Sequence, residues 1–164
     1  RAMADSHMEL PVVNASYEEL DGRDFAPFRV LSDMPMAMTA HVVYTAIDPK
    51  RPSTTSKTVI RDVTRGAIGF DGLLMTDDLS MKALKGGFKA RAKAALAAGC
   101  DVVLHCNGDM DEMKAVAEGC RKLKGHARRR ADAAMARLAR VPEPFDVEQG
   151  RARLSAAFEG RFDG

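Results

Sequence analysis

The chain has 164 residues, enough for one domain with its own core, and its 46% hydrophobic and 29% charged residues are typical of a globular protein. A net charge of +2 gives no reason to expect nucleic acid or an anionic membrane as a partner, and no apolar run is long enough to span a bilayer. The three cysteines have neither the spacing of a metal site nor the pattern of a disulfide framework, which favours a reducing, cytoplasmic location.

Two short helices are predicted near the N-terminus. Ser16 and Glu19 have the spacing of a capping box, so a helix should begin at Ser16. Pro27 suits the first turn of a second helix, which we expect to carry Phe28 and Leu31 inward.

Strands and helices then alternate along the chain. The apolar patterns predict strands at Met36–Val43, Leu73–Met75 and Asp101–Cys106, and helices at Thr58–Ala67, Phe88–Ala98, about Ala127–Arg140 and Arg151–Phe158. Such alternation indicates right-handed βαβ units, with the strands near Met36 and Asp101 on either side of Leu73–Met75 in one parallel sheet. The pattern alone fits a small open α/β sheet. The basic run Arg128–Arg130 is expected to form a solvated helix face.

Two carboxylates, Asp77 and Asp78, directly follow the predicted strand Leu73–Met75 and Thr76. Parallel α/β folds place their catalytic groups where the chain leaves a buried strand for a loop. Taken alone, the same two residues could equally cap the next helix or solvate a loop.

One stretch resembles the nucleophile motif of family 3 glycoside hydrolases: residues 69–81, with the sequence Gly-Phe-Asp-Gly-Leu-Leu-Met-Thr-Asp-Asp-Leu-Ser-Met. The resemblance is strongest to the bacterial β-N-acetylglucosaminidases (β-hexosaminidases) that recycle peptidoglycan. Two further stretches fit that branch in the expected order, residues 4–11 and 38–44. The resemblance, which runs to about Asn107, implies an α/β fold made of the last three βα units of a (β/α)8 TIM-type barrel plus C-terminal helices. Residues 1–164 would then be the C-terminal part of a single barrel domain whose N-terminal half is absent.

The resemblance implies a role for three residues. Asp77 would be the nucleophile, because the family motif places it directly after a Ser or Thr, here Thr76. His7 would be the acid/base, since histidine titrates at about pH 6.5 and can serve in both roles near neutrality. Asp5 would orient His7 and favour its imidazolium form. For Asp78 we prefer a cap or an acceptor behind the site.

His41 and Met75 are weaker candidates for substrate binding. His41 follows an apolar run, so it could touch the sugar, support Asp77, or be a hydrogen-bonded core histidine. Met75 lies inside the nucleophile motif and could line the pocket, although methionine is more often core filler.

The resemblance therefore implies a retaining exo-β-N-acetylglucosaminidase that releases N-acetylglucosamine from GlcNAc-anhydromuramoyl peptides by double displacement. No metal or organic cofactor is implied, and the expected partners are the muropeptide substrate and the missing N-terminal half. Two alternatives stay open. A β-N-acetylglucosaminide phosphorylase would use the same Asp/His pair, and a non-catalytic α/β interaction fragment would use neither.

Overall fold

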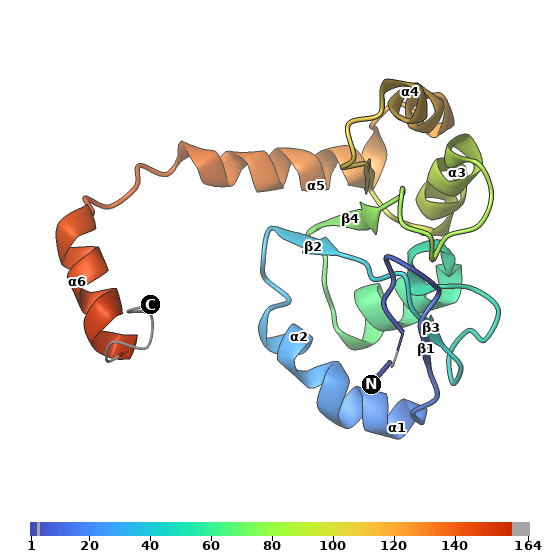
Figure 1. The fold of residues 1–164 in the computed structure, drawn as a ribbon, viewed down its shortest axis with the longest axis horizontal. Coiled ribbons are helices and arrows are strands. Elements are labelled where there is room, and N and C mark those ends of the chain that lie inside the picture. Colours follow the sequence, from blue (N-terminus) through green and yellow to red (C-terminus); the bar gives the residue numbers. More distant parts are fainter. Residues whose placement is uncertain (3, 159–164) are drawn as a thin grey trace.

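A three-stranded parallel sheet forms the centre of the molecule in the computed structural model, which describes residues 1–2 and 4–158 (Figure 1). Its order is β2 (Met36–Met38), β4 (Leu73–Asp78) and β5 (Val102–Leu104). Met36 pairs with Leu73, and Met75 pairs with Val102. The predicted arrangement of these three strands in one parallel sheet is therefore confirmed.

The prediction of one buried strand from Met36 to Val43 is wrong. β2 ends at Met38, and the chain turns before β3 (Val43–Tyr44), which pairs in parallel with β1 (Val12–Val13) as a separate small sheet. The turn is held by side chains from further along the chain, since the Ser53 hydroxyl donates to the carbonyl oxygen of Ala40 and the Thr54 hydroxyl lies 3.2 Å from the same oxygen.

The N-terminal helices begin as predicted but bury different residues. The capping box is present, with Glu19 N donating to Ser16 Oγ at 3.2 Å and Ser16 N donating to Glu19 Oε2 at 3.3 Å. The helical segments are α1 (Tyr17–Glu19), the π-helical turn η1 (Leu20–Asp24) and α2 (Ala26–Val30). Phe28 and Leu31 are 59% and 50% exposed, so their predicted inward orientation is wrong. The wide turn of η1 instead directs Leu20 and Phe25 into the core.

Helices and turns cover the sheet and continue beyond it. A 3₁₀ turn, η2 (Ser53–Thr55), precedes the π-helix η3 (Val59–Ala67). The elements that follow are α3 (Phe88–Ala98), α4 (Met110–Gly119), α5 (Gly125–Ala136), the 3₁₀ turn η4 (Arg137–Ala139) and α6 (Val147–Phe158). The predicted bounds of α3 are confirmed. Gly99 ends this helix with a φ of 123°, and a Cβ at that position would come within 2.9 Å of Ile60.

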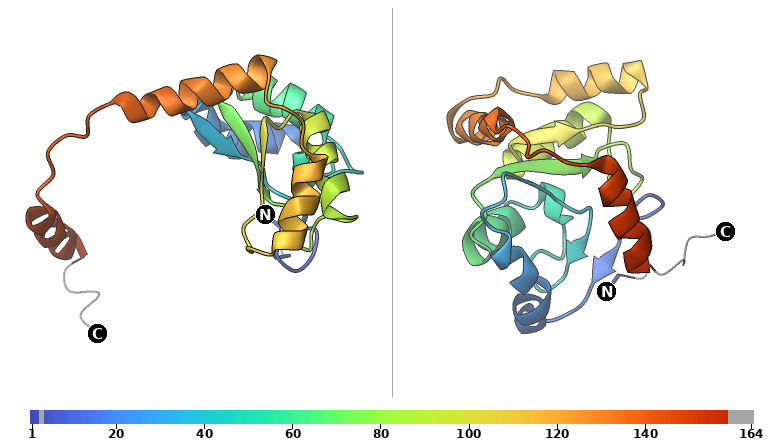
Figure 2. Two further views of the ribbon diagram at one scale, coloured as in Figure 1. Left: turned by 90° about the horizontal axis from the view of Figure 1, so that it is seen from above. Right: turned by 90° about the vertical axis from the view of Figure 1, so that its left-hand side faces the viewer.

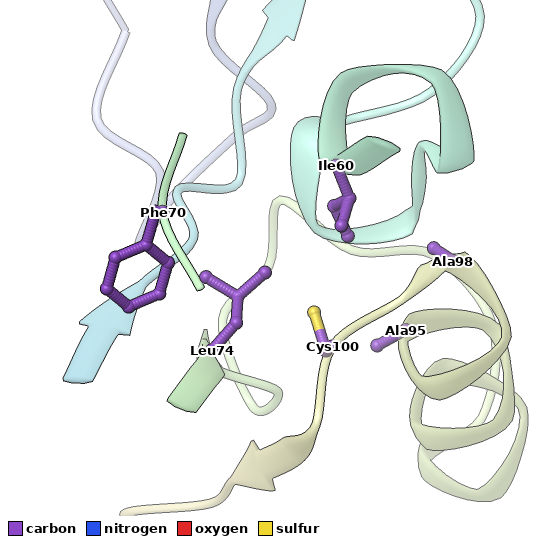
Figure 3. Close-up of a cluster of buried hydrophobic side chains, with 6 residues drawn as sticks. All are labelled: Ile60, Phe70, Leu74, Ala95, Ala98 and Cys100. Atoms are coloured by element: carbon purple, nitrogen blue, oxygen red, sulfur yellow. The ribbon is translucent and has the colours of Figure 1, made fainter. Parts of the chain in front are cut away.

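The main core cluster lies between the sheet, η3 and α3. Figure 3 shows its side chains, which are Ile60, Phe70, Leu74, Ala95, Ala98 and Cys100. Burial raises the pKa of the Cys100 thiol to about 12, so this cysteine packs as an apolar residue rather than reacting.

A charge network fastens α5 to the start of β4, which corrects the expectation that Arg128–Arg130 is merely solvated. Arg129 and Arg130 both donate to the carboxylate of Asp71, and Arg130 also reaches Asp101. The Asp101 carboxylate is 4% exposed and accepts from Arg65 at 2.8 Å as well. These pairs join residues up to 59 positions apart, so helical periodicity alone could not show them.

The last helix, α6, stands apart from the body (Figures 1 and 2). The domain expected from the resemblance extends to residue 164, and its residues 159–164, like residue 3, lie outside the described part. None of the helices within residues 1–2 and 4–158 has the length and apolarity needed to cross a membrane.

Candidate active site

Asp77 lies at the carboxyl end of β4, in the central position of the sheet. Its carboxylate accepts a hydrogen bond from the backbone N–H of Asp78 at 2.8 Å. The preceding residue, Thr76, is fully buried, and its hydroxyl oxygen accepts from the backbone N–H of Leu104 in β5 at 2.9 Å. The end of β4 is thus fixed against its neighbour, while the Asp77 side chain remains partly exposed.

Asp78 is held by groups on both sides of the strand end. Its carboxylate accepts from the backbone N–H of Ser80 at 3.0 Å, from the Ser80 hydroxyl, and from the backbone N–H of Cys106 at 3.2 Å. Burial alone would raise the pKa of Asp78, but these hydrogen bonds outweigh it and the pKa is lowered. Asp78 is therefore an ionised acceptor that ties the loop after β4 to the end of β5.

His41 lies behind this strand end in the core. Its ring is fully buried, with Nδ1 2.7 Å from Thr54 Oγ1 and Nε2 2.9 Å from the carbonyl oxygen of Asp78. The sequence left open whether His41 touches sugar, supports Asp77 or is a core histidine. The bonds are those of a core histidine that supports the peptide next to Asp77, and sugar contact would require the ring to become exposed.

The Asp5–His7 pair sits on the N-terminal loop. Asp5 Oδ1 is 2.8 Å from His7 Nδ1 and also accepts from the His7 backbone N–H at 3.0 Å. The pKa of His7 is raised by the hydrogen bond and charge of Asp5, and further by the charges of Asp77 and Asp78. The pKa of Asp5 is lowered by its backbone and side-chain bonds to His7. Both side chains are largely exposed, at 66% and 73%.

The loop after β4 links the two parts of the candidate site. The backbone N–H of Ala83 in that loop donates to the carbonyl oxygen of Ser6, which lies between Asp5 and His7, at 3.3 Å. The structure thereby places the dyad loop beside the loop that follows Asp77. In the described residues no hydrogen bond joins His7 to Asp77 directly.

Arg91 is a positioning residue that the sequence analysis missed. From α3 it donates to the carbonyl oxygens of Leu79 at 2.6 Å, Gly86 at 2.8 Å and Met81 at 3.3 Å, so it holds both ends of the loop after β4. Its guanidinium also lies over the ring of Phe88, 5.1 Å from the centroid. The sequence offered one indication of this role: Arg91 lies near the start of a predicted helix, a short loop after residues 69–81.

The remaining polar groups near the strand ends do not form a metal site. His105 Nε2 is 2.9 Å from Glu112 Oε2, which also accepts from Asn107 at 2.6 Å. Within the described residues no group of three or more His, Cys, Asp or Glu side chains could hold a metal ion. Met75 is partly buried inside β4, between its strand partners Met38 and Val102.

Comparisons with known proteins identify the family of this chain. The model of the glycosyl hydrolase family 3 N terminal domain matches residues 1–141. The "Beta-hexosaminidase" of Tolumonas auensis is 45% identical over 109 residues, which cover 63% of this chain and 32% of that protein. Its counterpart in Alkalilimnicola ehrlichii is 48% identical over 107 residues, covering 63% of this chain and 30% of that protein.

Solved structures show the same likeness. A glycoside hydrolase family 3 beta-N-acetylglucosaminidase from Paenibacillus sp. str. FPU-7 has a TM-score of 0.70 and 30% identity, over 89% of this chain and 31% of that chain. NagZ from Neisseria gonorrhoeae, in complex with N-trifluoroacetyl-D-glucosamine, has a TM-score of 0.66 and 35% identity, over 80% of this chain and 38% of that chain. The chain thus spans about a third of the length of the curated relatives it matches. Because the family match is continuous over residues 1–141 and includes all three motifs, this chain belongs to glycosyl hydrolase family 3.

Proposed function

We propose that this chain carries the nucleophile and the acid/base of a retaining exo-β-N-acetylglucosaminidase. The observation that carries the proposal is the pairing of Asp77, at the end of the central strand, with an Asp5–His7 dyad on the adjoining loop. The Asp5–His7 dyad and Asp77 come from two separate motifs, and the fold brings their loops into contact. A chance Asp-x-His triplet in an unrelated surface loop would have no reason to lie there.

In the proposed mechanism the transferred proton is carried by Nε2 of His7. Nδ1 is engaged by Asp5, so Nε2 is the nitrogen free to face a substrate. In the first step the carboxylate of Asp77 attacks the anomeric carbon while the imidazolium gives its Nε2 proton to the leaving oxygen. The neutral ring then takes a proton from water, and that water cleaves the glycosyl ester to restore the Asp77 carboxylate.

The proposed substrate class is taken from the names of the relatives and from the ligand in one of their structures. Two of those named above are called beta-hexosaminidase and one a beta-N-acetylglucosaminidase, and NagZ is in complex with N-trifluoroacetyl-D-glucosamine. We propose the same sugar here, released from peptidoglycan fragments in the cytoplasm. The raised pKa of His7 supports the assignment, because it keeps the acid protonated over more of the neutral range.

We further propose that the rest of a (β/α)8 barrel completes this site. The chain corresponds to about a third of its relatives and contributes a central sheet with three strands. A parallel sheet of this kind is normally covered on both faces, and its edges are paired. The remaining barrel units would supply the sugar-binding wall opposite Asp77.

A covalent trap tests the nucleophile. A 5-fluoro N-acetylglucosaminyl fluoride is incubated with this chain in complex with the remaining part of a family relative, and the adduct is located by peptide mapping. We expect the label on Asp77 and none after Asp77→Ala, while Asp78→Asn should retain labelling at Asp77. A label on Asp78, or elsewhere, would overturn the assignment. Product analysis with and without phosphate separates hydrolysis from phosphorolysis.

A further inference from the structure

The loop between β4 and α3, residues 79–87, is firmly packed although it forms no helix or strand. Its buried side chains, each 0% to 7% exposed, are Leu79, Met81, Ala83 and Leu84. Leu79 and Leu84 share a core cluster with Ala92 of α3. Because close-packed interiors deform little, a shift at one part of this β4–α3 loop should be felt along the rest of it.

Arg91 fixes the middle of the β4–α3 loop. From α3, its Nη1 donates to the carbonyl oxygens of Leu79 and Met81, and its Nε donates to that of Gly86. These carbonyls lie on both sides of Ala83 in the sequence, so the bonds enclose this residue. A planar guanidinium holds several acceptors at fixed angles, which the flexible ammonium of lysine does not reproduce.

The turn that carries the proposed acid/base touches the β4–α3 loop at Ala83. The turn, residues 5–9, is closed by two backbone N–H groups that donate to the carbonyl oxygen of Asp5, at 2.9 and 3.0 Å. In the part of the chain that the structure describes, one hydrogen bond joins the turn to the loop, from Ala83 N to the carbonyl oxygen of Ser6. Since Ser6 directly precedes His7, a displacement of Ala83 should displace the imidazole.

The β4–α3 loop starts directly after the proposed nucleophile. Asp78, the neighbour of Asp77, accepts from the backbone N–H of Ser80 in the loop at 3.0 Å. One loop therefore runs from the nucleophile to the contact with the acid/base turn. We propose that Arg91, through this loop, sets the position of His7 relative to Asp77 and thereby acts on proton transfer to the leaving oxygen. The inference rests on the proposed function and adds the residue that positions its acid.

The kinetic test compares substrates that differ in their need for an acid. This chain is assembled with the part of the Tolumonas auensis protein that it does not match, and active enzyme is counted by the 5-fluoro label. The value of kcat/KM is measured for the 2,4-dinitrophenyl and the phenyl N-acetyl-β-glucosaminide. Phenol is by far the poorer leaving group, so its departure depends more on general acid catalysis.

Three variants separate position from charge. Arg91→Met removes the bonds to the loop at similar length, and Arg91→Lys keeps the charge. The matched control is Lys93→Met, which removes a positive charge from an exposed position on the same helix.

We expect Arg91→Met to lower kcat/KM for the phenyl glycoside about tenfold more than for the dinitrophenyl glycoside. Arg91→Lys should fall in between, and Lys93→Met should stay within about twofold of the unmodified chain on both substrates. Equal losses on the two substrates would overturn the proposal, because they would indicate damage to the fold or to Asp77. An Arg91→Lys enzyme as active as the unmodified one would also overturn it, since charge alone would then suffice.

NMR titration of the chain itself tests the same geometry without turnover. The charge of Asp77 helps to raise the pKa of His7, so Asp77→Asn should lower the His7 midpoint. This shift should be clearly smaller in the Arg91→Met background, because the coupling between two charges weakens with distance. Retained signals of the buried His41 ring show that the core is intact.

An equal shift in both backgrounds, or none in the unmodified chain, would overturn the positioning role. If the coupling is lost as expected but the assembled enzyme cleaves neither glycoside, the result counts against the proposed function alone.

Discussion

Replacing His41 by leucine tests how the end of β4 is held. The Nε2 nitrogen must carry a hydrogen, because its partner, the carbonyl oxygen of Asp78, can only accept. A neutral ring then leaves Nδ1 to accept from the Thr54 hydroxyl. Leucine fills the space but removes one partner from each group. The carbonyl of Asp78 keeps the backbone N–H of Met81 at 3.2 Å, and the Thr54 hydroxyl keeps Thr39 Oγ1 at 2.9 Å, so each lost bond should cost about 0.5–1.5 kcal/mol. We therefore expect His41→Leu to lower the free energy of unfolding by roughly 1–3 kcal/mol.

Urea denaturation followed by circular dichroism measures this loss. His41→Gln keeps an amide N–H for the carbonyl of Asp78 and should fall between wild type and His41→Leu. His126, at the exposed start of α5, provides the matched control, and His126→Leu should change the free energy by less than about 0.5 kcal/mol. If His41→Leu were as mild as His126→Leu, the buried bonds would not be what holds Asp78 in place.

Three further predictions concern charged groups. Asp5→Asn should move the NMR titration midpoint of His7 to lower pH, because the bond and charge of Asp5 are the main causes of its raised pKa, and an unchanged midpoint would speak against the dyad. The hydrogen bonds from Arg129 and Arg130 lower the pKa of Asp71 from 3.8 to about 2. The ionised carboxylate of Asp71 therefore contributes its full stabilisation above about pH 3.8, and this stabilisation is lost as the pH falls toward 2. Asp71→Asn should flatten the stability profile in that window, and parallel profiles would contradict the ion pairs. Asp101→Ala should cost about 3–5 kcal/mol in urea unfolding, because it leaves the buried guanidinium of Arg65 without its carboxylate and Arg130 with Asp71 alone, whereas a loss below about 1 kcal/mol would show that the network behaves as a surface pair.

Features set by local chemistry could be predicted from the sequence. The Ser16 capping box and the end of α3 at Gly99 depend on groups within a few residues, so their sequence patterns identify them. The order of the parallel strands follows from the strand–helix alternation and the handedness of βαβ units. The position of Asp77 at the end of β4 belongs to the same class of prediction.

Features set by distant contacts could not be predicted. The sequence pattern around Phe28 and Leu31 shows that two apolar residues share a helix, but it does not show whether other residues of this chain pack against them. The turn at Ala40 depends on hydroxyls that come 13 and 14 residues later. Arg130 looked like a surface residue because its partner, Asp71, lies 59 residues away. In each case the deciding group is on another element, and helix or strand periodicity does not report it.

The two halves of the proposed chemistry are supported to different degrees by this chain. Asp78, the neighbour of Asp77, is anchored at its carbonyl oxygen by His41 and at its carboxylate by Ser80 and Cys106, so the proposed nucleophile is preorganised by groups within the described residues. His7 is exposed and is held mainly by Asp5 and by the single backbone bond from Ala83 to Ser6. Preorganisation is what makes such groups effective in a transition state. The placement of Asp77 is thus set largely within this chain, whereas His7 has few contacts in the described residues that would fix it.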